Sequence, residues 1–237
     1  RTRKKIKFFI MEDIVYKKNY LSADLVEEIE NFYSKINDAR SGGPKSYESA
    51  NSSSLGKEGA WDIPLRLELP KNPVNKVIDK LKKDFGQIII HTSSIRLLGY
   101  PFAPHSDIRS SEWLLDSREN YKTGFTFLIP LSWQKGYKPG TAFFSSPPID
   151  GEPLYIEHAD VLPKFQKESV AKNFSVKKLI EWNNPGDLIA WKNYMYHCSM
   201  TDKDFNYSDN EYCKKFISIE TFLPKSEIVG VPLLGPF

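Results

Sequence analysis

The stretch QIIIHTSSIRLLGYPFAPHSD at residues 87–107 joins a strand-like run to two candidate metal ligands. It begins as a β-branched and aliphatic run, which is typical of a strand, and ends on a histidine and an aspartate two positions apart. Residues i and i+2 of an extended chain share a face, so the side chains of His105 and Asp107 are expected to converge on one point. They are candidate metal ligands, but a third ligand must come from elsewhere in the fold.

Five further strand-like runs follow, separated by Gly, Pro, Asn and Asp: residues 123–133, 140–146, 153–158, 187–193 and 214–223. No helix-length apolar pattern alternates with them, which argues against a parallel α/β sheet. We therefore predict a mainly β fold, an antiparallel sandwich or barrel with flanking helices, and one short helix within residues 160–180.

Two helices are predicted before this β region. The first starts at Ser22, a capping residue, and repeats apolar residues at every third or fourth position over residues 25–36. The second has Asn72 as its cap and Pro73 at its first helical position, and Gly86 stops it. Both are expected to pack outside the sheet.

Composition limits the classes of protein. The 237 residues are 40% hydrophobic and 14% aromatic, enough for a sizeable core. The net charge is +3 with the basic residues spread out, so no nucleic-acid partner is expected. Cys198 and Cys213 form no disulfide framework, which predicts a reducing, cytoplasmic setting. No apolar run reaches the ~18 residues of a membrane span. The apolar run within residues 1–10 is too short for a signal peptide. The Gly/Ser-rich residues 40–60 predict a long loop, either a lid over a site or a surface excursion.

The third ligand has few candidates, because the chain has four histidines, at positions 91, 105, 158 and 197. His197 directly follows the strand predicted over residues 187–193. Two His and one Asp would occupy one face of an octahedral metal and leave the other face open, as in non-haem Fe(II) oxygenases. A lone His-x-Asp pair often arises by chance, so the assignment depends on the surrounding sequence.

Five sequence elements occur in the order of one family: IRLLGYPFAPHSD (95–107), FTFLIPLSW (125–133), GTAFF (140–144), NPGDLIAWKN with YHCSM (184–200) and KKFISIETF (214–222). Together they resemble the Fe(II)/2-oxoglutarate-dependent oxygenases, most nearly those organised like prolyl 4-hydroxylases. The resemblance implies a single domain, residues 1–237, with a double-stranded β-helix (jelly-roll) core over 87–223. Helical support over 11–86 would precede the core, and a tail over 224–237 would follow it.

The resemblance also implies the chemistry. His105, Asp107 and His197 would bind Fe(II), with 2-oxoglutarate as cosubstrate and O2 as oxidant. The expected reaction is hydroxylation of a small molecule or of an amino-acid or peptidyl substrate, coupled to decarboxylation of 2-oxoglutarate to succinate and CO2. Related halogenases replace the metal-binding carboxylate, so Asp107 disfavours halogenation. Arg109 and Arg118 flank the metal motif and are candidates for binding a carboxylate or phosphate of the substrate.

The far carboxylate of 2-oxoglutarate needs a cation, which the resemblance places at Lys214 or Lys215, with Thr126 as a further contact. The 18 residues from His197 to Lys215 exceed the family's usual spacing and leave the choice between the lysines open. Neighbours on a strand face opposite ways, so one of the two points elsewhere. We prefer Lys215, because it directly precedes Phe216 as the lysine of prolyl hydroxylases precedes an aromatic residue.

Two other interpretations keep the same fold. A cupin-like jelly-roll could act as a binding module without catalysis, and the same triad could hold zinc for hydrolysis. The strand order and the lysine of the last strand favour the oxygenase. The substrate, the oligomeric state and the source organism do not follow from the sequence.

Overall fold

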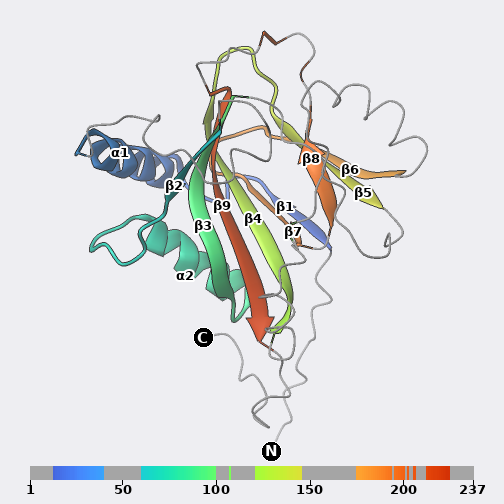
Figure 1. Ribbon diagram of the computed structural model, residues 1–237, viewed down its shortest axis with the longest axis horizontal. Helices are drawn as coiled ribbons and strands as arrows, with labels where there is room; N and C mark the ends of the chain where they lie inside the picture. Colours follow the sequence, from blue (N-terminus) through green and yellow to red (C-terminus); the bar gives the residue numbers. More distant parts are fainter. Residues whose placement is uncertain are drawn as a thin grey trace, which may run out of the picture.

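The computed structural model describes residues 13–39, 60–99, 107, 121–145, 175–193, 195–200, 202, 205–206 and 212–224. They form two antiparallel sheets and two helices (Figure 1). The major sheet has the strand order β1-β7-β4-β9-β3-β2, and the minor sheet has the order β6-β5-β8. In chain order the elements are β1 (Ile14–Lys17), α1 (Ala23–Ala39), β2 (Ala60–Pro64), α2 (Val74–Phe85), β3 (Ile89–Leu98), β4 (Tyr121–Trp133), β5 (Gly140–Ser145), β6 (Ser175–Glu181), β7 (Leu188–Lys192), β8 (Tyr196–Ser199) and β9 (Lys214–Pro224).

Side chains along the major sheet alternate between two cores. Phe127 and Ile217 belong to the core under the helices, whereas their neighbours Leu128 and Phe216 belong to the core on the other face of the sheet. This two-residue period follows from the pleat of the strands. It decides which residues can reach a site between the two sheets and which are covered by the helices.

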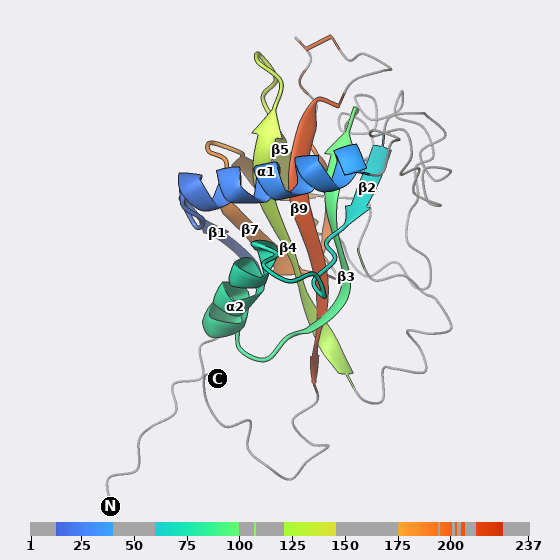
Figure 2. The same ribbon diagram turned by 90° about the vertical axis from the view of Figure 1, so that its left-hand side faces the viewer.

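The helices α1 and α2 lie on the same face of the major sheet (Figure 2). The apolar positions predicted for the second helix are all buried: Val74, Val77, Ile78, Leu81 and Phe85. This helix ends at Gly86, whose φ of 82° is left-handed and favours glycine, and whose N–H donates to the carbonyl of Lys82. Both predicted helices and the mainly β, antiparallel fold class are confirmed.

Four strands were not predicted. β1 and β2 come from the segment expected to be only helical, and they form the two edges of the major sheet. Being four and five residues long, they show no clear alternation and depend on pairing with β7 and β3. The helix expected within 160–180 is wrong from Ser175 onward, because β6 pairs there with β5. The short β8 was also missed. The remaining predictions lie outside the described residues: the loop over 40–59, the strand over 153–158, residues 160–174 and the tail beyond 224.

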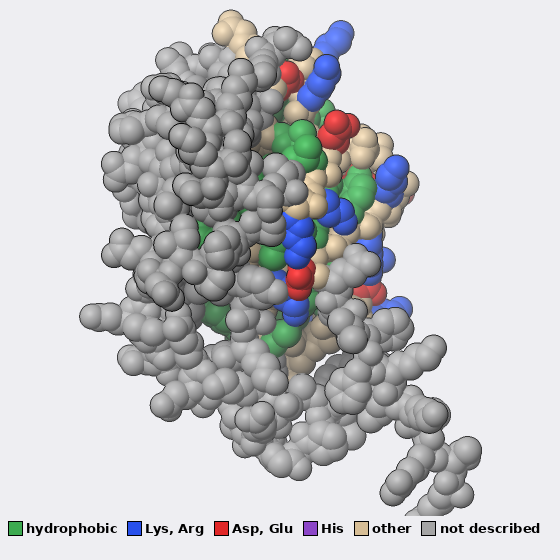
Figure 3. Space-filling model, turned by 90° about the vertical axis from the view of Figure 1, so that its right-hand side faces the viewer, with side chains coloured by type: hydrophobic (Ala, Val, Ile, Leu, Met, Phe, Trp, Pro, Cys, Tyr) green, Lys and Arg blue, Asp and Glu red, His purple; other side chains and the backbone are tan. Residues whose placement is uncertain are grey.

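The surface on the side of the minor sheet carries charges of both signs. Figure 3 shows Lys and Arg side chains there interleaved with acidic and hydrophobic ones. Lys177 of β6 pairs with Asp13 at 2.9 Å, and since both side chains are about 40% exposed, this pair adds little stability. Within the described ranges, no helix is long and apolar enough to cross a membrane.

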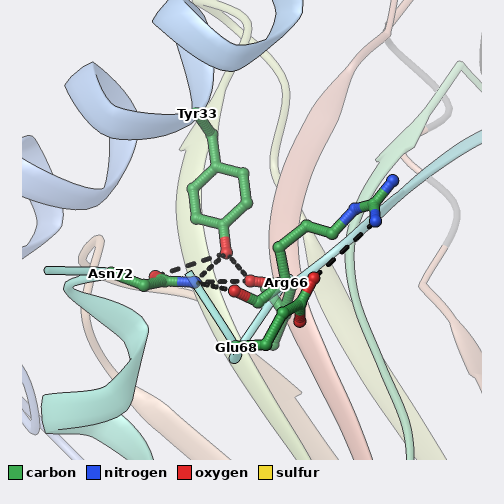
Figure 4. Close-up of polar contacts among 5 residues, drawn as sticks. Tyr33, Arg66, Glu68 and Asn72 are labelled. Carbon is green, nitrogen blue, oxygen red and sulfur yellow. Dashed lines mark hydrogen bonds and ion pairs between the residues drawn. The ribbon is translucent and has the colours of Figure 1, made fainter. Parts of the chain in front are cut away.

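A buried polar network joins α1 to the turn that precedes α2 (Figure 4). The Asn72 side-chain amide donates to the carbonyl oxygens of Leu65 at 2.6 Å and Arg66 at 2.9 Å, and its oxygen accepts the first N–H of α2 at 3.0 Å. The Tyr33 hydroxyl donates to the same Leu65 carbonyl. On the exposed side of this turn, Arg66 and Glu68 form an ion pair at 3.7 Å.

Replacing Asn72 by Ala should lower the free energy of unfolding by about 3 kcal/mol, because the N–H of Val74 loses its side-chain acceptor and the carbonyl groups of Leu65 and Arg66 each lose one of their donors. Urea denaturation measures this. Asn75→Ala is the matched control: Asn75 donates one partly buried bond to Leu67 O at 3.2 Å, so its loss should cost below about 1 kcal/mol. Equal losses in the two variants would show that the network does not fasten the turn.

Candidate active site

A cavity lies between the two sheets. Strands β3, β4, β7 and β9 of the major sheet line it from one side, and β5 and β8 of the minor sheet from the other. Apolar side chains form much of the wall. The polar lining residues are Arg96, Asp107, Thr126, Thr141, His197, Ser199, Lys214 and Ser218.

Asp107 is held in one orientation. Its backbone N–H donates to the carbonyl of Asn193 at 3.0 Å. Its Oδ2 accepts hydrogen bonds from the Thr126 hydroxyl at 2.6 Å and from the Trp191 indole N–H at 3.0 Å. With one oxygen fixed by two donors, the other oxygen, Oδ1, is directed toward His197 Nε2, 3.8 Å away.

His197 of β8 presents a defined ring nitrogen to Asp107. Its Nδ1 lies 3.0 Å from the carbonyl of Met195, which can only accept, so Nδ1 carries the proton in the neutral ring and Nε2 keeps its lone pair. The ring lies against Trp191, with centroids 4.6 Å apart. The side chains of His197 and Asp107 are only 8% and 5% exposed. A histidine that binds a metal usually donates its other ring N–H to a backbone carbonyl or a carboxylate, and a carboxylate ligand usually accepts hydrogen bonds from neighbouring groups.

The donor set fits a metal ion in part. The 3.8 Å between His197 Nε2 and Asp107 Oδ1 is too long for a hydrogen bond. Imidazole nitrogen and carboxylate oxygen suit Fe(II) and Zn(II). His105, the third ligand predicted from sequence, lies outside the described residues, as do Arg109 and Arg118. Among the residues that the structure describes, no group of three His, Cys, Asp or Glu could hold a metal.

The two lysines of β9 point to opposite faces of the major sheet. Lys214 lines the cavity, is 1% exposed, and donates to the Ser199 hydroxyl at 2.5 Å. Lys215 lies on the helix side, where it forms an ion pair with Glu30 of α1. Glu30 also accepts a hydrogen bond from Ser132 at 3.0 Å. The geometry therefore favours Lys214 over Lys215 as the cation of the cavity, contrary to our preference from the sequence.

Burial lowers the pKa of Lys214 to about 8, and the nearby thiols of Cys213 and Cys198 offset this only in part. The ammonium group also lies 5.1 Å from the centre of the Trp182 ring. No Asp or Glu of the described ranges pairs with it. A buried ammonium without a carboxylate partner is costly, so the cavity has a position that an anion would stabilise.

The structure adds to the sequence analysis at three residues of the cavity. Trp191 is buried in a hydrophobic core, and its indole N–H also donates to Asp107. Thr126, predicted as a contact of the far carboxylate of 2-oxoglutarate, lines the cavity and donates its hydroxyl to Asp107. Arg96 was not singled out, although a charged residue between the apolar neighbours Ile95 and Leu97 of a strand is a recognisable signal of a polar site on that face.

Solved structures share this fold. The epimerase SnoN, in complex with Fe3+, alpha ketoglutarate and nogalamycin RO, matches 95% of this chain and 89% of its own, with TM-score 0.55 and 12% identity. The non-haem alpha ketoglutarate dependent carbocyclase SnoK from nogalamycin biosynthesis matches 95% and 87%, with TM-score 0.56 and 12% identity. A Pseudomonas putida prolyl-4-hydroxylase matches 91% and 94%, with TM-score 0.46 and 11% identity.

No protein-family model and no curated protein sequence matches the chain. The similarity to SnoN and SnoK therefore concerns the fold. It confirms the predicted double-stranded β-helix core.

Replacing Lys214 by Met should stabilise the ligand-free protein at pH 7. A pKa lowered from 10.5 to about 8 corresponds to about 3 kcal/mol of destabilisation below pH 8, because the unfolded chain binds the proton more tightly. As the pH rises from 8 to 10.5, folded Lys214 loses its proton first and this penalty disappears. The advantage of the variant should therefore fall below about 1 kcal/mol at pH 10.

Urea denaturation of both proteins at pH 7 and pH 10 measures the difference. The control is Lys215→Met, which loses the ion pair with Glu30 on the other face and should be less stable than wild type at pH 7. If Lys214→Met is no more stable to urea than wild type at pH 7, another group must already stabilise the buried ammonium in the ligand-free protein.

Proposed function

We propose that the protein is an Fe(II)/2-oxoglutarate-dependent oxygenase that hydroxylates a small molecule or an amino-acid or peptidyl substrate. The observation that carries this proposal is the arrangement of one cavity: Asp107 and His197 side by side, and the buried cation of Lys214 within the same walls. The fold shared with SnoN and SnoK supports the general kind of enzyme.

In this proposal Asp107, His197 and His105 hold the iron. When bound, iron and 2-oxoglutarate would activate O2, the oxidant; one oxygen atom would go to succinate as CO2 is released, and the other would oxidise the substrate. The chain's own part is positional. Thr126 and Trp191 fix the Asp107 carboxylate, the carbonyl of Met195 fixes the tautomer of His197, and the apolar walls limit the access of water.

Lys214 is proposed to bind the far carboxylate of 2-oxoglutarate. His197 and Ser199 are two residues apart on β8, so they share a face at a spacing of ~7 Å. Ser199 accepts a hydrogen bond from Lys214, so the ammonium lies about one such step from the His197 ligand. This step is comparable to the length of a five-carbon dicarboxylate. Within the described part of the chain Lys214 has no carboxylate partner, so the anion would also offset the cost of burying its ammonium group.

Because Lys214 lines the cavity and Lys215 faces the helices, a binding experiment can test which of the two lysines contacts 2-oxoglutarate. Anaerobic addition of Fe(II) and 2-oxoglutarate to the apo-protein should produce a weak visible charge-transfer band, which reports both molecules bound at one site. Lys214→Met should raise the 2-oxoglutarate concentration at half-saturation on the order of 10–100-fold, because a charged contact is lost. Lys215→Met, on the helix side, should change it less than about twofold.

Failure of the wild-type band in folded, iron-loaded protein would count against the oxygenase and favour a jelly-roll binding module. A band that responds to Lys215→Met and not to Lys214→Met would assign the carboxylate to the other lysine.

Thr126→Val should weaken iron binding on the order of 10-fold, because Asp107 loses the hydroxyl that orients it. Anaerobic calorimetric titration with Fe(II) measures the dissociation constant. Asp107→Ala is the positive control and should abolish tight binding. Ser132→Ala removes a hydroxyl from the opposite face of β4, where Ser132 donates to Glu30, and should leave the constant unchanged. Wild-type affinity in Thr126→Val would exclude the orienting role.

A further inference from the structure

Trp182 is a buried residue of the cavity wall, and the proposed iron and 2-oxoglutarate sites give it no role. It directly follows β6 and is 5% exposed. Its indole N–H donates to the Thr141 hydroxyl at 3.1 Å, and the Lys214 ammonium lies 5.1 Å from the centre of its ring. All three residues line the cavity. One side chain therefore contacts a hydroxyl through its N–H and a cation through its ring.

Thr141 and Lys214 are linked a second time, through Ser199. Thr141 of β5 is opposite Ser199 of β8 in the register of the minor sheet, so their side chains share a face with Cβ atoms about 5 Å apart. Ser199 accepts a hydrogen bond from Lys214 at 2.5 Å. We refer to the four residues as the polar cluster, in which each lies beside the next: Trp182, Thr141, Ser199 and Lys214.

The polar cluster has donors to spare. An ammonium group has three N–H donors, and among the described residues Lys214 uses one of them, on Ser199. The Thr141 hydroxyl accepts from the indole, which leaves its own O–H to donate, and the described part of the chain offers that O–H no acceptor. Buried donors without acceptors are costly. A ligand group that only accepts, such as a carboxylate, matches these donors.

Packing alone does not explain a tryptophan at position 182. Its ring packs edge to face against Phe216 with centroids 5.5 Å apart, and a phenylalanine would make the same kind of contact. The tryptophan adds a donor, and a buried indole N–H needs an acceptor. Here the acceptor is a hydroxyl of the cavity wall. The bond orients that hydroxyl, because its oxygen faces the indole and its hydrogen must then point elsewhere.

We propose that Trp182 is a positioning residue for the far carboxylate of 2-oxoglutarate: its N–H orients the Thr141 hydroxyl as a second donor beside Lys214. This inference rests on the proposed oxygenase function and assigns two further residues to its cosubstrate site. The far carboxylate accepts from the Lys214 ammonium and from the Thr141 hydroxyl together. The indole ring also offsets part of the cost of burying the ammonium group before the cosubstrate binds.

The test compares two ligands in the charge-transfer titration of the iron-loaded protein. One is 2-oxoglutarate, and the other is 2-oxopentanoate, which has the same carbon chain with a methyl group in place of the far carboxylate. Thr141→Val should raise the half-saturating concentration of 2-oxoglutarate on the order of 10-fold, but that of 2-oxopentanoate less than about twofold, because only the first ligand uses the hydroxyl. Thr141→Ser restores the hydroxyl and should stay within about threefold of wild type with 2-oxoglutarate.

A double variant tests whether the indole acts through the hydroxyl. Trp182→Phe should raise the half-saturating concentration of 2-oxoglutarate about fivefold, and adding it to Thr141→Val should raise the value no further. Trp133→Phe is the matched control, because Trp133 packs against the same core cluster as Trp182 and is not among the lining residues of the cavity. It should change the value less than about twofold.

Each variant is first compared with wild type by circular dichroism and by calorimetric titration with Fe(II), whose dissociation constant should not change. Thr141→Ala, which leaves more room beside the indole, takes the place of Thr141→Val if that variant does not fold.

Three outcomes would overturn the inference. In the first, the band forms and Lys214→Met weakens 2-oxoglutarate binding, but Thr141→Val keeps the wild-type value, so the oxygenase stands and the second donor fails. In the second, Thr141→Val weakens both ligands equally, which a structural role explains. In the third, the effects of Trp182→Phe and Thr141→Val multiply in the double variant, so the indole does not act through the hydroxyl. Absence of the band in wild type would overturn the oxygenase together with this inference.

Discussion

The two-residue period of the major sheet is the constraint on which the site depends. Each central strand has one row of side chains under the helices and one row facing the minor sheet. On β9 this alternation places two adjacent lysines in different surroundings: Lys215 is neutralised by Glu30 of a helix, and Lys214 is enclosed in the cavity. The helices therefore support the candidate site without lining it. They cover one face of the major sheet, and the polar side chains of the cavity lie on the other face.

The sequence predicts the fold class well, because long strands and the second helix have strong local patterns. The β-branched and aromatic composition of β4, and the apolar face and terminal glycine of α2, can each be recognised without tertiary information. The short edge strands β1 and β2 cannot be recognised in this way, because four or five residues carry too little pattern. Their structure depends on hydrogen bonds to β7 and β3. β6 was not recognised for a related reason: the short helix was expected somewhere within residues 160–180, Lys177 and Lys178 of β6 are exposed, and pairing with β5 determines its structure.

The sequence suggests the candidate site by residue type but does not give the orientation of its side chains. Asp107 and His197 were chosen as ligands that must meet, and the structure brings them together from segments 90 residues apart. The choice between Lys214 and Lys215 depended on strand register, which a one-residue error inverts. The ion pair of Lys215 with Glu30 of α1 shows which of the two lysines faces the helices. A contact between residues 30 and 215 cannot be inferred from a local sequence pattern. The role of Trp191 was missed because the sequence does not show whether the indole N–H of a buried tryptophan has a polar partner.

Stability and binding make opposite demands on this cavity. Lys214 is buried against a hydroxyl and aromatic rings, an environment that lowers its pKa and costs folding free energy. Its neighbour on the same strand forms an ion pair with Glu30 on the other face of the sheet. Among the described residues, no carboxylate pairs with Lys214. The strand that neutralises one lysine on its helix side therefore encloses the next at a cost in folding free energy, and a bound anion would remove that cost.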